Sequence, residues 1–229
     1  GTQTTLLNSA PLLLGYRSTG DQLITYDNAS GAIQALNLAS GAISSLATGV
    51  LTGASIQAGG FAAFDSQANR VTLLSRDAGG VLLTSVNLGT GAQSTTRPNL
   101  PNLQALASSS PIANTVMGLW EDASQPGVLV IGSINTTDGN HQTLARLSTG
   151  NRSGGFSNYN VDVNPEGIAF VHFNGLYGGR QGDWVAALDT NTGTLLGATQ
   201  NPGDLIRGNA LVANESNQQL SVRITALPS

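Results

Sequence analysis

The two histidines and the side chains of one polar loop are the groups in this sequence most suited to holding a metal. His141 directly follows N-T-T-D-G-N (Asn135–Asn140), whose oxygen-bearing side chains and Gly after Asp are features of calcium loops. The loop lacks a bidentate Glu at the required downstream spacing, so we interpret it as a polar hairpin loop. A zinc site built on His141 and His172 would need additional carboxylate ligands.

His172 lies in the run I-A-F-V-H-F, which has the length and residue types of a strand. Because side chains alternate between the two faces of a strand, His172 should share a face with Ile168 and Phe170. We therefore interpret it as a structural histidine that is hydrogen-bonded within a sheet.

A second group of side chains could bind a sugar. The Trp120 ring offers a stacking surface, and the adjacent Glu121 and Asp122 offer acceptors for hydroxyl groups. The large aromatic residues do not recur at a fixed period, however, as repeated binding pockets would require. For Trp184 we favour packing in the core or at an edge.

Motifs for common enzyme chemistry and features of nucleic-acid binding are absent from the sequence. It contains no G-x-S-x-G elbow and no P-loop, and we interpret G-G-R-Q-G-D (Gly178–Asp183) as a mobile surface loop. The 229 residues include no Cys, and the formal net charge is −4 with no basic cluster, which argues against nucleic acid as a partner. No apolar run approaches the roughly 20 residues of a membrane-spanning helix.

Short strands joined by turns are the elements that must position these side chains. The clearest case is V-A-A-L-D-T-N-T-G-T-L-L-G (Val185–Gly197), in which a D-x-N-T-G turn separates two apolar runs. Similar Leu-ended strands followed by polar turns end at four glycines, which we take as equivalent: Gly41, Gly91, Gly150 and Gly193. No segment shows helical periodicity, so the sequence predicts an all-β fold.

The strands group into successive units of the size of a propeller blade. The first unit comprises Leu12–Tyr16, Gln22–Tyr26, Ala32–Leu38 and Ala42–Ala47, and the second comprises Phe61–Phe64, Arg70–Ser75, Val81–Leu88 and Ala92–Thr96. Residues 97–111 are interpreted as a long connection because their prolines interrupt any strand. The third unit comprises Val116–Trp120, Val128–Ile134, Gln142–Leu147 and a weak strand near Gly155–Tyr159.

The fourth unit contains Gly167–Phe173, Trp184–Leu188 and Thr194–Thr199, with one strand fewer or a functional loop in its place. Two strands remain near the end of the sequence, Ala210–Ala213 and Gln219–Leu227, and Thr2–Leu7 forms a strand without a unit of its own. We therefore expect one domain over residues 1–229. It would be a propeller of about five four-stranded blades whose last blade combines strands from both termini, because such closure leaves no open seam.

Three stretches resemble the repeats of YVTN, NHL and gluconolactonase-like propellers. F-A-A-F-D-S-Q-A-N-R-V-T-L-L-S (Phe61–Ser75) and N-A-L-V-A-N-E-S-N-Q-Q-L-S-V-R-I (Asn209–Ile224) are similar to the inner hairpin of those repeats. V-A-A-L-D-T-N-T-G (Val185–Gly193) looks like the outer hairpin of YVTN and quinoprotein-type repeats. The resemblance is at the level of a superfamily and implies a propeller.

The resemblance also implies where ligands would bind. In such propellers the loops that precede the innermost strands line the mouth of the central tunnel, and the corresponding positions here are Gln57, Asn114, N-P-E-G (Asn164–Gly167), Arg207 and Asn209. Gluconolactonase-like enzymes bind a divalent cation through a Glu in an E-G step and an Asn that opens an inner strand. Glu166 and Asn209 are similar to these two positions, although no third ligand and no catalytic Asp can be matched. A hard cation such as Ca²⁺ needs several oxygen ligands.

The leading hypothesis is a non-enzymatic binding or assembly module that is secreted, on the cell surface or periplasmic. The absence of Lys and the low content of charged residues are more typical of such proteins than of cytosolic enzymes. Its partner would be a protein, a glycan or another copy of the chain. The alternatives are a divalent-cation-dependent hydrolase or lactonase with Glu166 and Asn209 at the metal, and a carbohydrate-binding propeller around Trp120.

Overall fold

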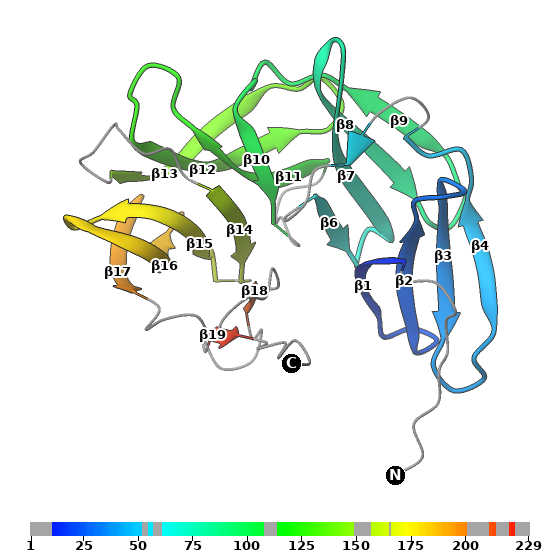
Figure 1. The fold of residues 1–229 in the computed structure, drawn as a ribbon. Helices are drawn as coiled ribbons and strands as arrows, with labels where there is room; N and C mark the ends of the chain where they lie inside the picture. The colour runs from blue at the N-terminus through cyan, green and yellow to red at the C-terminus, as the bar shows by residue number, and fades with distance from the viewer. Residues whose placement is uncertain are drawn as a thin grey trace.

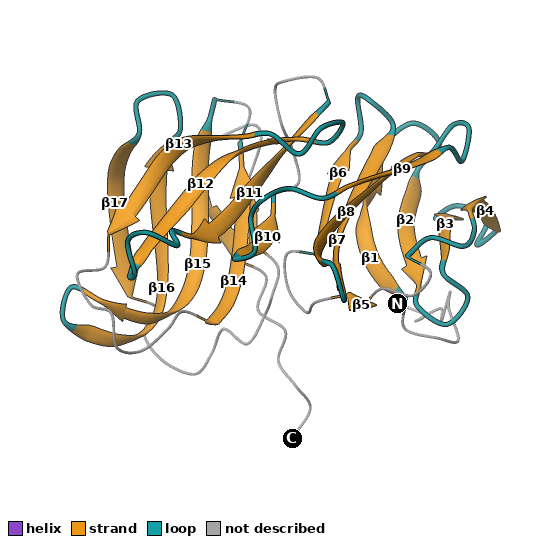
Figure 2. Cartoon of the chain, turned by 90° about the horizontal axis from the view of Figure 1, so that it is seen from above, coloured by secondary structure: helices purple, strands orange, loops and turns teal. Residues whose placement is uncertain are grey.

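The computed structural model describes residues 11–51, 55–56, 61–107, 114–148, 157–164, 166–200, 211–213 and 220–222. All regular elements in these residues are β-strands (Figure 2). The described part of the chain therefore contains no helix that could cross a membrane.

The strands form four antiparallel sheets, which we call blades 1 to 4, and one small additional sheet. Blade 1 consists of β1 (Leu12–Arg17), β2 (Gln22–Asp27), β3 (Ala32–Asn37) and β4 (Ile43–Ala47). Blade 2 consists of β5 (Ser55–Ile56), β6 (Ala62–Asp65), β7 (Arg70–Asp77), β8 (Gly80–Asn87) and β9 (Gln93–Thr96). Here β5 and β6 both pair with β7, so two short segments share the position of the first strand.

Blades 3 and 4 have the same four-stranded order. Blade 3 consists of β10 (Leu103–Leu106), β11 (Thr115–Glu121), β12 (Val128–Asn135) and β13 (His141–Ser148). Blade 4 consists of β14 (Ser157–Val163), β15 (Ile168–Tyr177), β16 (Arg180–Asp189) and β17 (Thr194–Gln200). A two-stranded sheet of β18 (Leu211–Ala213) and β19 (Leu220–Val222) follows blade 4 in the chain.

The blades follow one another along an arc with their first strands on the inside (Figure 1). β1 contacts β6, β6 contacts β10, β10 contacts β14, and β14 contacts β18. This radial arrangement of four-stranded antiparallel sheets is a β-propeller, and it confirms the predicted fold class. Four complete blades lie in the described residues, and Thr2–Leu7 lies outside them.

Three apolar clusters fill the spaces between neighbouring blades. Leu14 and Ile24 pack with Val71 between blades 1 and 2. The next two clusters lie between blades 2 and 3 and between blades 3 and 4. Gly15 permits the first contact, because a Cβ atom at this position would lie 2.3 Å from Cδ1 of Phe64 in blade 2. Each blade therefore contributes apolar side chains to its neighbours.

The turn between the third and fourth strand has the same chemistry in every blade. The last residue of the third strand is Asn or Asp, and its side-chain oxygen accepts a backbone N–H two or three residues later: Asn37, Asn87, Asn135 and Asp189. Its carbonyl accepts the N–H of a positive-φ glycine, at Gly41, Gly91, Gly139 and Gly193. The prediction for blade 3 was therefore wrong: the equivalent glycine is Gly139, in the predicted polar loop Asn135–Asn140, and not Gly150.

Two predicted boundaries also differ from the structure. The proposed connection 97–111 contains β10, the innermost strand of blade 3, while the weak strand assigned to the third unit is β14 and begins blade 4. The proposed surface loop Gly178–Asp183 is a two-residue turn at Gly178 and Gly179, both with positive φ, followed by the start of β16. Blade 4 therefore has all four strands, and its β15–β16 hairpin is the longest of the fold.

Candidate functional site

One face of the propeller carries the turns between the first and second strand of each blade. The residue before each second strand has a positive φ, namely Asp21, Asn69, Asn114 and Gly167. Its carbonyl accepts the N–H of the residue that follows the third strand, at distances of 2.8 to 2.9 Å. Asn114 and Glu166, two predicted ligand-binding residues, both lie in this set of turns.

These turns follow the innermost strands, whereas the predicted tunnel-mouth loops were expected to precede them. Asn114 lies before β11, the second strand of blade 3, and Glu166 lies between β14 and β15. The local motifs N-T and E-G indicate the start of a strand, but they do not show which strand of the blade it is. Gln57, Arg207 and Asn209 lie outside the described residues.

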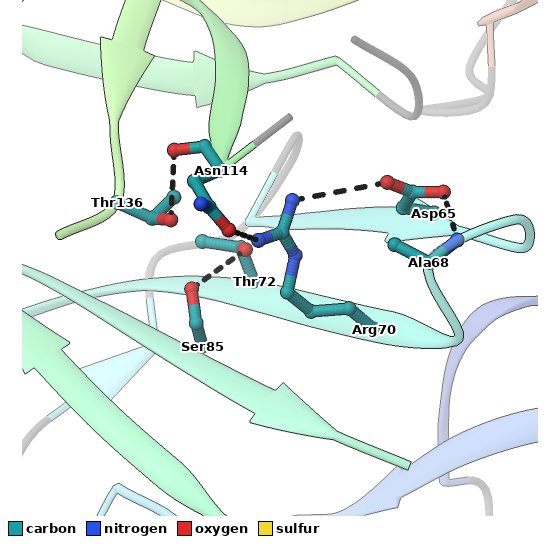
Figure 3. Close-up of polar contacts among 7 residues, drawn as sticks. All are labelled: Asp65, Ala68, Arg70, Thr72, Ser85, Asn114 and Thr136. Carbon is teal, nitrogen blue, oxygen red and sulfur yellow. Dashed lines mark hydrogen bonds and ion pairs between the residues drawn. The ribbon is translucent and has the colours of Figure 1, made fainter. Parts of the chain in front are cut away.

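Asn114 links blade 2 to blade 3. Its Oδ1 accepts a hydrogen bond from Arg70 Nη1 at 3.2 Å, and its carbonyl accepts from Oγ1 of Thr136 at 3.0 Å (Figure 3). Arg70 also lies 3.8 Å from the Asp65 carboxylate. Below the guanidinium group, the hydroxyls of Thr72 and Ser85 form a buried hydrogen bond (Figure 3). The side-chain oxygen of Asn114 is therefore already used between blades.

Blades 1 and 2 are linked in the same way. Arg17 Nη1 donates to Oδ1 of Asn69 at 3.0 Å, and Arg17 also bonds Gln22. Asn69 and Asn114 occupy equivalent positions before the second strand of their blades. This repetition favours a structural role for the Arg–Asn contact, because a ligand site would have no reason to recur in this form.

Glu166 is exposed in the β14–β15 turn. Its carbonyl accepts from Nδ2 of Asn191 at 2.9 Å, and the next residue, Gly167, accepts from the amide and the hydroxyl of Thr190. Asn191 and Thr190 belong to the β16–β17 turn, so the two turns hold each other in place. Within the described residues, no group of three or more His, Asp or Glu could hold a metal ion. Because Asn209 lies outside the described residues, the cation site at Glu166 and Asn209 stays a prediction.

Trp120 packs inside the molecule. Its side chain is 5% exposed in the cluster between blades 2 and 3, and it meets the His141 ring edge-on at a centroid distance of 5.7 Å. Gly132 on β12 makes room for the ring, since a Cβ atom there would lie 2.4 Å from Cη2 of Trp120. A sugar could therefore stack on Trp120 only if this cluster opened.

The neighbours of Trp120 lie at the rim of blade 3. Glu121 is the last residue of β11, and Asp122 begins the turn toward β12. Asp122 accepts hydrogen bonds from the Ser124 amide and hydroxyl and pairs with Arg146 of β13. The Ser124 and Arg146 contacts lower the pKa of Asp122 to about 2. This carboxylate is therefore engaged in a structural ion pair.

His172 lies on β15 with Ile168 and Phe170 on the same face, as the alternation predicts. It is opposite Asn160 of β14 and Val185 of β16, and its Nε2 is 4.0 Å from Oδ1 of Asp183. The other face of β15 carries Ala169, Val171 and Phe173 into the cluster between blades 3 and 4. The His172 face therefore points away from blade 3, and β18 contacts β14 and β15 of the same blade.

The sequence interpretation missed an apolar row on the face of blade 1 that points away from blade 2, which we call its outward face. The strand register places Tyr16 opposite Leu23, Leu23 opposite Leu36, and Leu36 opposite Ile43. Directly opposite residues of antiparallel strands share a face, so these four side chains form one row across the blade. Tyr16 and Ile43 are each 49% exposed, and the nearby Leu13 is 56% exposed. The alternation of apolar and polar residues in each strand indicates an apolar face, but only the strand register shows that these four side chains lie in one row.

Comparisons with known proteins show the fold. No protein-family model and no curated protein matches the chain. Among solved structures, TolB from Acinetobacter baumannii aligns with 83% of this chain and 44% of its own, with 13% identity and a TM-score of 0.57. A TolB candidate from Agrobacterium tumefaciens aligns with 87% of this chain and 64% of its own, again with 13% identity and a TM-score of 0.57.

The chain thus spans less than two thirds of the length of either TolB structure. At 13% identity these likenesses carry the architecture alone, without activity or partners. Together with the radial four-stranded sheets, they identify the chain as a β-propeller.

Proposed function

We propose that this β-propeller is a binding or assembly module that docks another macromolecule in a secreted, cell-surface or periplasmic setting. The observation that supports it is the apolar row on the outward face of blade 1. Tyr16 and Ile43 stand at the two ends of this row, with Leu23 and Leu36 between them. Tyr16 and Ile43 are each 49% exposed, and exposed apolar side chains grouped on one face are more typical of interaction sites than scattered single residues.

The surface has the features of a docking site. Tyr16 has an apolar ring and a hydroxyl that donates to Oδ1 of Asp21 at 2.9 Å, which fixes the ring at the end of the row. Full burial of a large apolar side chain is worth about 1.5–3 kcal/mol, so completing the burial of Ile43 would contribute about half of that. Leu36 is only 2% exposed, so it has almost no surface left for a partner to cover. A partner would therefore gain most from the two ends of the row.

Site-specific photocrosslinking tests this proposal. A photoreactive amino acid at Ile43 should give a discrete adduct in the protein's native surroundings, and the same group at Ala29, an exposed turn residue of the same blade, should not. The double substitution of Tyr16 and Ile43 by Ser should weaken binding of the captured partner at least about tenfold, the equivalent of about 1.4 kcal/mol. The absence of any adduct specific to Ile43 would contradict the proposed function.

A further inference from the structure

The inner strand of blade 1 exposes two apolar side chains that have buried counterparts in other blades. Counted from the positive-φ residue before each second strand, Tyr16 of blade 1 occupies the same position as Phe64 of blade 2 and Val163 of blade 4. Phe64 and Val163 are buried, whereas Tyr16 is half exposed. In the same way Leu13 corresponds to Val161 of blade 4, which is buried, while Leu13 is more than half exposed. These positions are therefore covered where a blade has a predecessor and open in blade 1.

Exposure at the outer strand does not distinguish blade 1. Ile43 of β4 lies opposite the last apolar residue of the third strand, and its equivalents in the other blades are Gln93, His141 and Leu195. All four are exposed, although blades 2, 3 and 4 each have a preceding blade in the arc (Figure 1). A preceding blade therefore covers the inner strand of its neighbour and leaves the outer strand partly open.

The surface that a preceding blade contributes to this contact has a small residue on its inner strand. Phe64 packs over Gly15 of blade 1, where a Cβ atom would lie 2.3 Å from its Cδ1. Ala63 of blade 2 belongs to the cluster with blade 3, and Ala105 of blade 3 belongs to the cluster with blade 4. Because protein interiors are close-packed, a small residue on one strand leaves room for a larger side chain on the facing strand.

A second copy of this chain does not offer such a surface through its blade 4. On the inner strand of that blade, the face that points away from blade 3 carries Asn160 and Asp162. Packing these groups on Leu13 and Tyr16 would set an amide and a carboxylate against apolar side chains, which costs free energy. Two blade 1 faces also match poorly, because their inner strands present large side chains at both positions. The complementary surface therefore belongs to a different polypeptide.

We propose that another polypeptide packs an antiparallel β-sheet on the outward face of blade 1, in the place of a preceding blade. A Gly or Ala on one strand of that sheet would face Leu13 and Tyr16. The inference deepens the proposed function and rests on it, since it names the kind of surface that docks and the strand that is covered. In this arrangement Leu13 becomes buried like Val161, while Ile43 stays partly exposed like Leu195.

Photocrosslinking at several positions in the protein's native surroundings tests this arrangement. A photoreactive amino acid at Leu13 or Tyr16 should give a higher yield of adduct than the same group at Ile43, and Ile43 should still exceed the Ala29 control. Mass spectrometry of the adducts should place the attachment points of Leu13 and Tyr16 on a β-strand of the partner, beside a Gly or Ala. A higher yield at Ile43 than at Leu13, or attachment to a helix, a loop or a glycan, would overturn the inference and leave docking on blade 1 intact. Adducts only within the chain itself, or none at any position, would contradict the proposed function as well.

Affinities measured with the captured partner, once it is purified, provide a second test. Leu13→Ser should raise the dissociation constant at least about tenfold and Ile43→Ser about threefold or less, because only the inner strand becomes fully covered. Replacing the facing Gly or Ala of the partner by Leu should also weaken binding at least about tenfold, because the contact has no room for a larger side chain. Ser44→Ala on the exposed β4 strand is the control and should leave affinity unchanged. A larger effect for Ile43→Ser than for Leu13→Ser would show docking at the outer end of the row and overturn the blade-like arrangement.

Discussion

Leu119 and Ile43 illustrate two different environments in the same propeller. Leu119 lies between blades 3 and 4 and is 0% exposed, whereas Ile43 lies on the outward face of blade 1 and is 49% exposed. Both belong to strands of four-stranded sheets, and both share a cross-strand row with other large side chains. The difference comes from the neighbour: a second blade covers Leu119, while the described residues leave Ile43 half uncovered.

This difference shows that burial in a propeller is decided by the contact between blades more than by the residue type in a strand. Ile24 and Leu36, on adjacent strands of blade 1, face opposite sides of one sheet. Ile24 packs toward blade 2, and Leu36 belongs to the row that ends at Ile43. Leu36 is 2% exposed and Ile43 is 49% exposed, so the docking role rests on the exposed ends of the row.

The largest effect is expected from a cavity between blades. Leu119→Ala should reduce the free energy of unfolding by about 2–5 kcal/mol, because the rigid sheets around it can close only part of the space. Urea unfolding followed by circular dichroism would measure it. A loss below about 1 kcal/mol would show that the contact between blades 3 and 4 is loosely packed and would remove the contrast with Ile43.

A smaller effect is expected from the repeated turn. Asn87→Ala removes the acceptor for the amides of Gly89 and Thr90, and Asn37→Ala removes the acceptor for the Ser40 amide. Each should cost about 1 kcal/mol, the usual net value of a lost turn or capping hydrogen bond. The loss should be somewhat larger for Asn37→Ala, because Asn37 Nδ2 also donates to the Gly20 carbonyl at 3.0 Å. Thermal unfolding of the two variants, with Ser94→Ala on β9 as an exposed control, would show it.

This local chemistry explains why the strands and the all-β class were predictable from sequence. Asn or Asp at the end of a strand and Gly a few residues later act within one turn, so no distant contact is needed to recognise them. The same locality caused the misassignment at Gly150, because S-T-G and T-D-G are equivalent as isolated strings. β10 was missed for a related reason: Pro98 and Pro101 precede it and masked a four-residue strand.

The candidate sites were harder to predict because they depend on register and on packing between blades. Trp120 became a sugar-binding candidate since the sequence does not reveal that Gly132, on the next strand, makes room for its ring. Asn114 was predicted to precede an innermost strand but lies before the second strand of blade 3, and its contact with Arg70 joins residues of two different blades. The row from Tyr16 to Ile43 needs three strand pairings to be known together. None of these features has a short motif.

Lowering the pH should affect the carboxylate contacts of the middle blades more than those of blade 1. The Arg97 contact and the Gly79 amide hold the pKa of Asp77 at about 2, and the Ser124 and Arg146 contacts do the same for Asp122. These pKa values lie below the usual range, so the ionised groups stabilise the fold above about pH 4. That contribution is lost as the pH falls from about 4 to about 2.

The test is the pH dependence of urea unfolding. Asp77→Asn should lower stability at pH 7, and its difference from the parent protein should shrink as the pH falls toward the pKa of about 2 and disappear below it, where both side chains are uncharged. Asp27 in blade 1 has a lowered pKa from Ser30 and the Ala29 amide and has no arginine among these partners. The effect of Asp27→Asn on the free energy of unfolding should therefore depend less on salt concentration than the effect of Asp77→Asn, because no ion pair is lost. A pH-independent difference for Asp77→Asn would exclude the Arg97 contact as its cause.

The smallest effect on stability is expected on the outward face of blade 1, where it is most informative. Ile43→Ser should change the free energy of unfolding by less than about 0.5 kcal/mol, because the side chain is half exposed and loses little burial. The same substitution should nevertheless weaken partner binding, so stability and binding are affected separately. Leu119→Ala would affect both by loosening the fold. If Ile43→Ser destabilised the isolated protein by about 2 kcal/mol, the row would already be covered within the monomer, and the docking role of blade 1 would have to be abandoned.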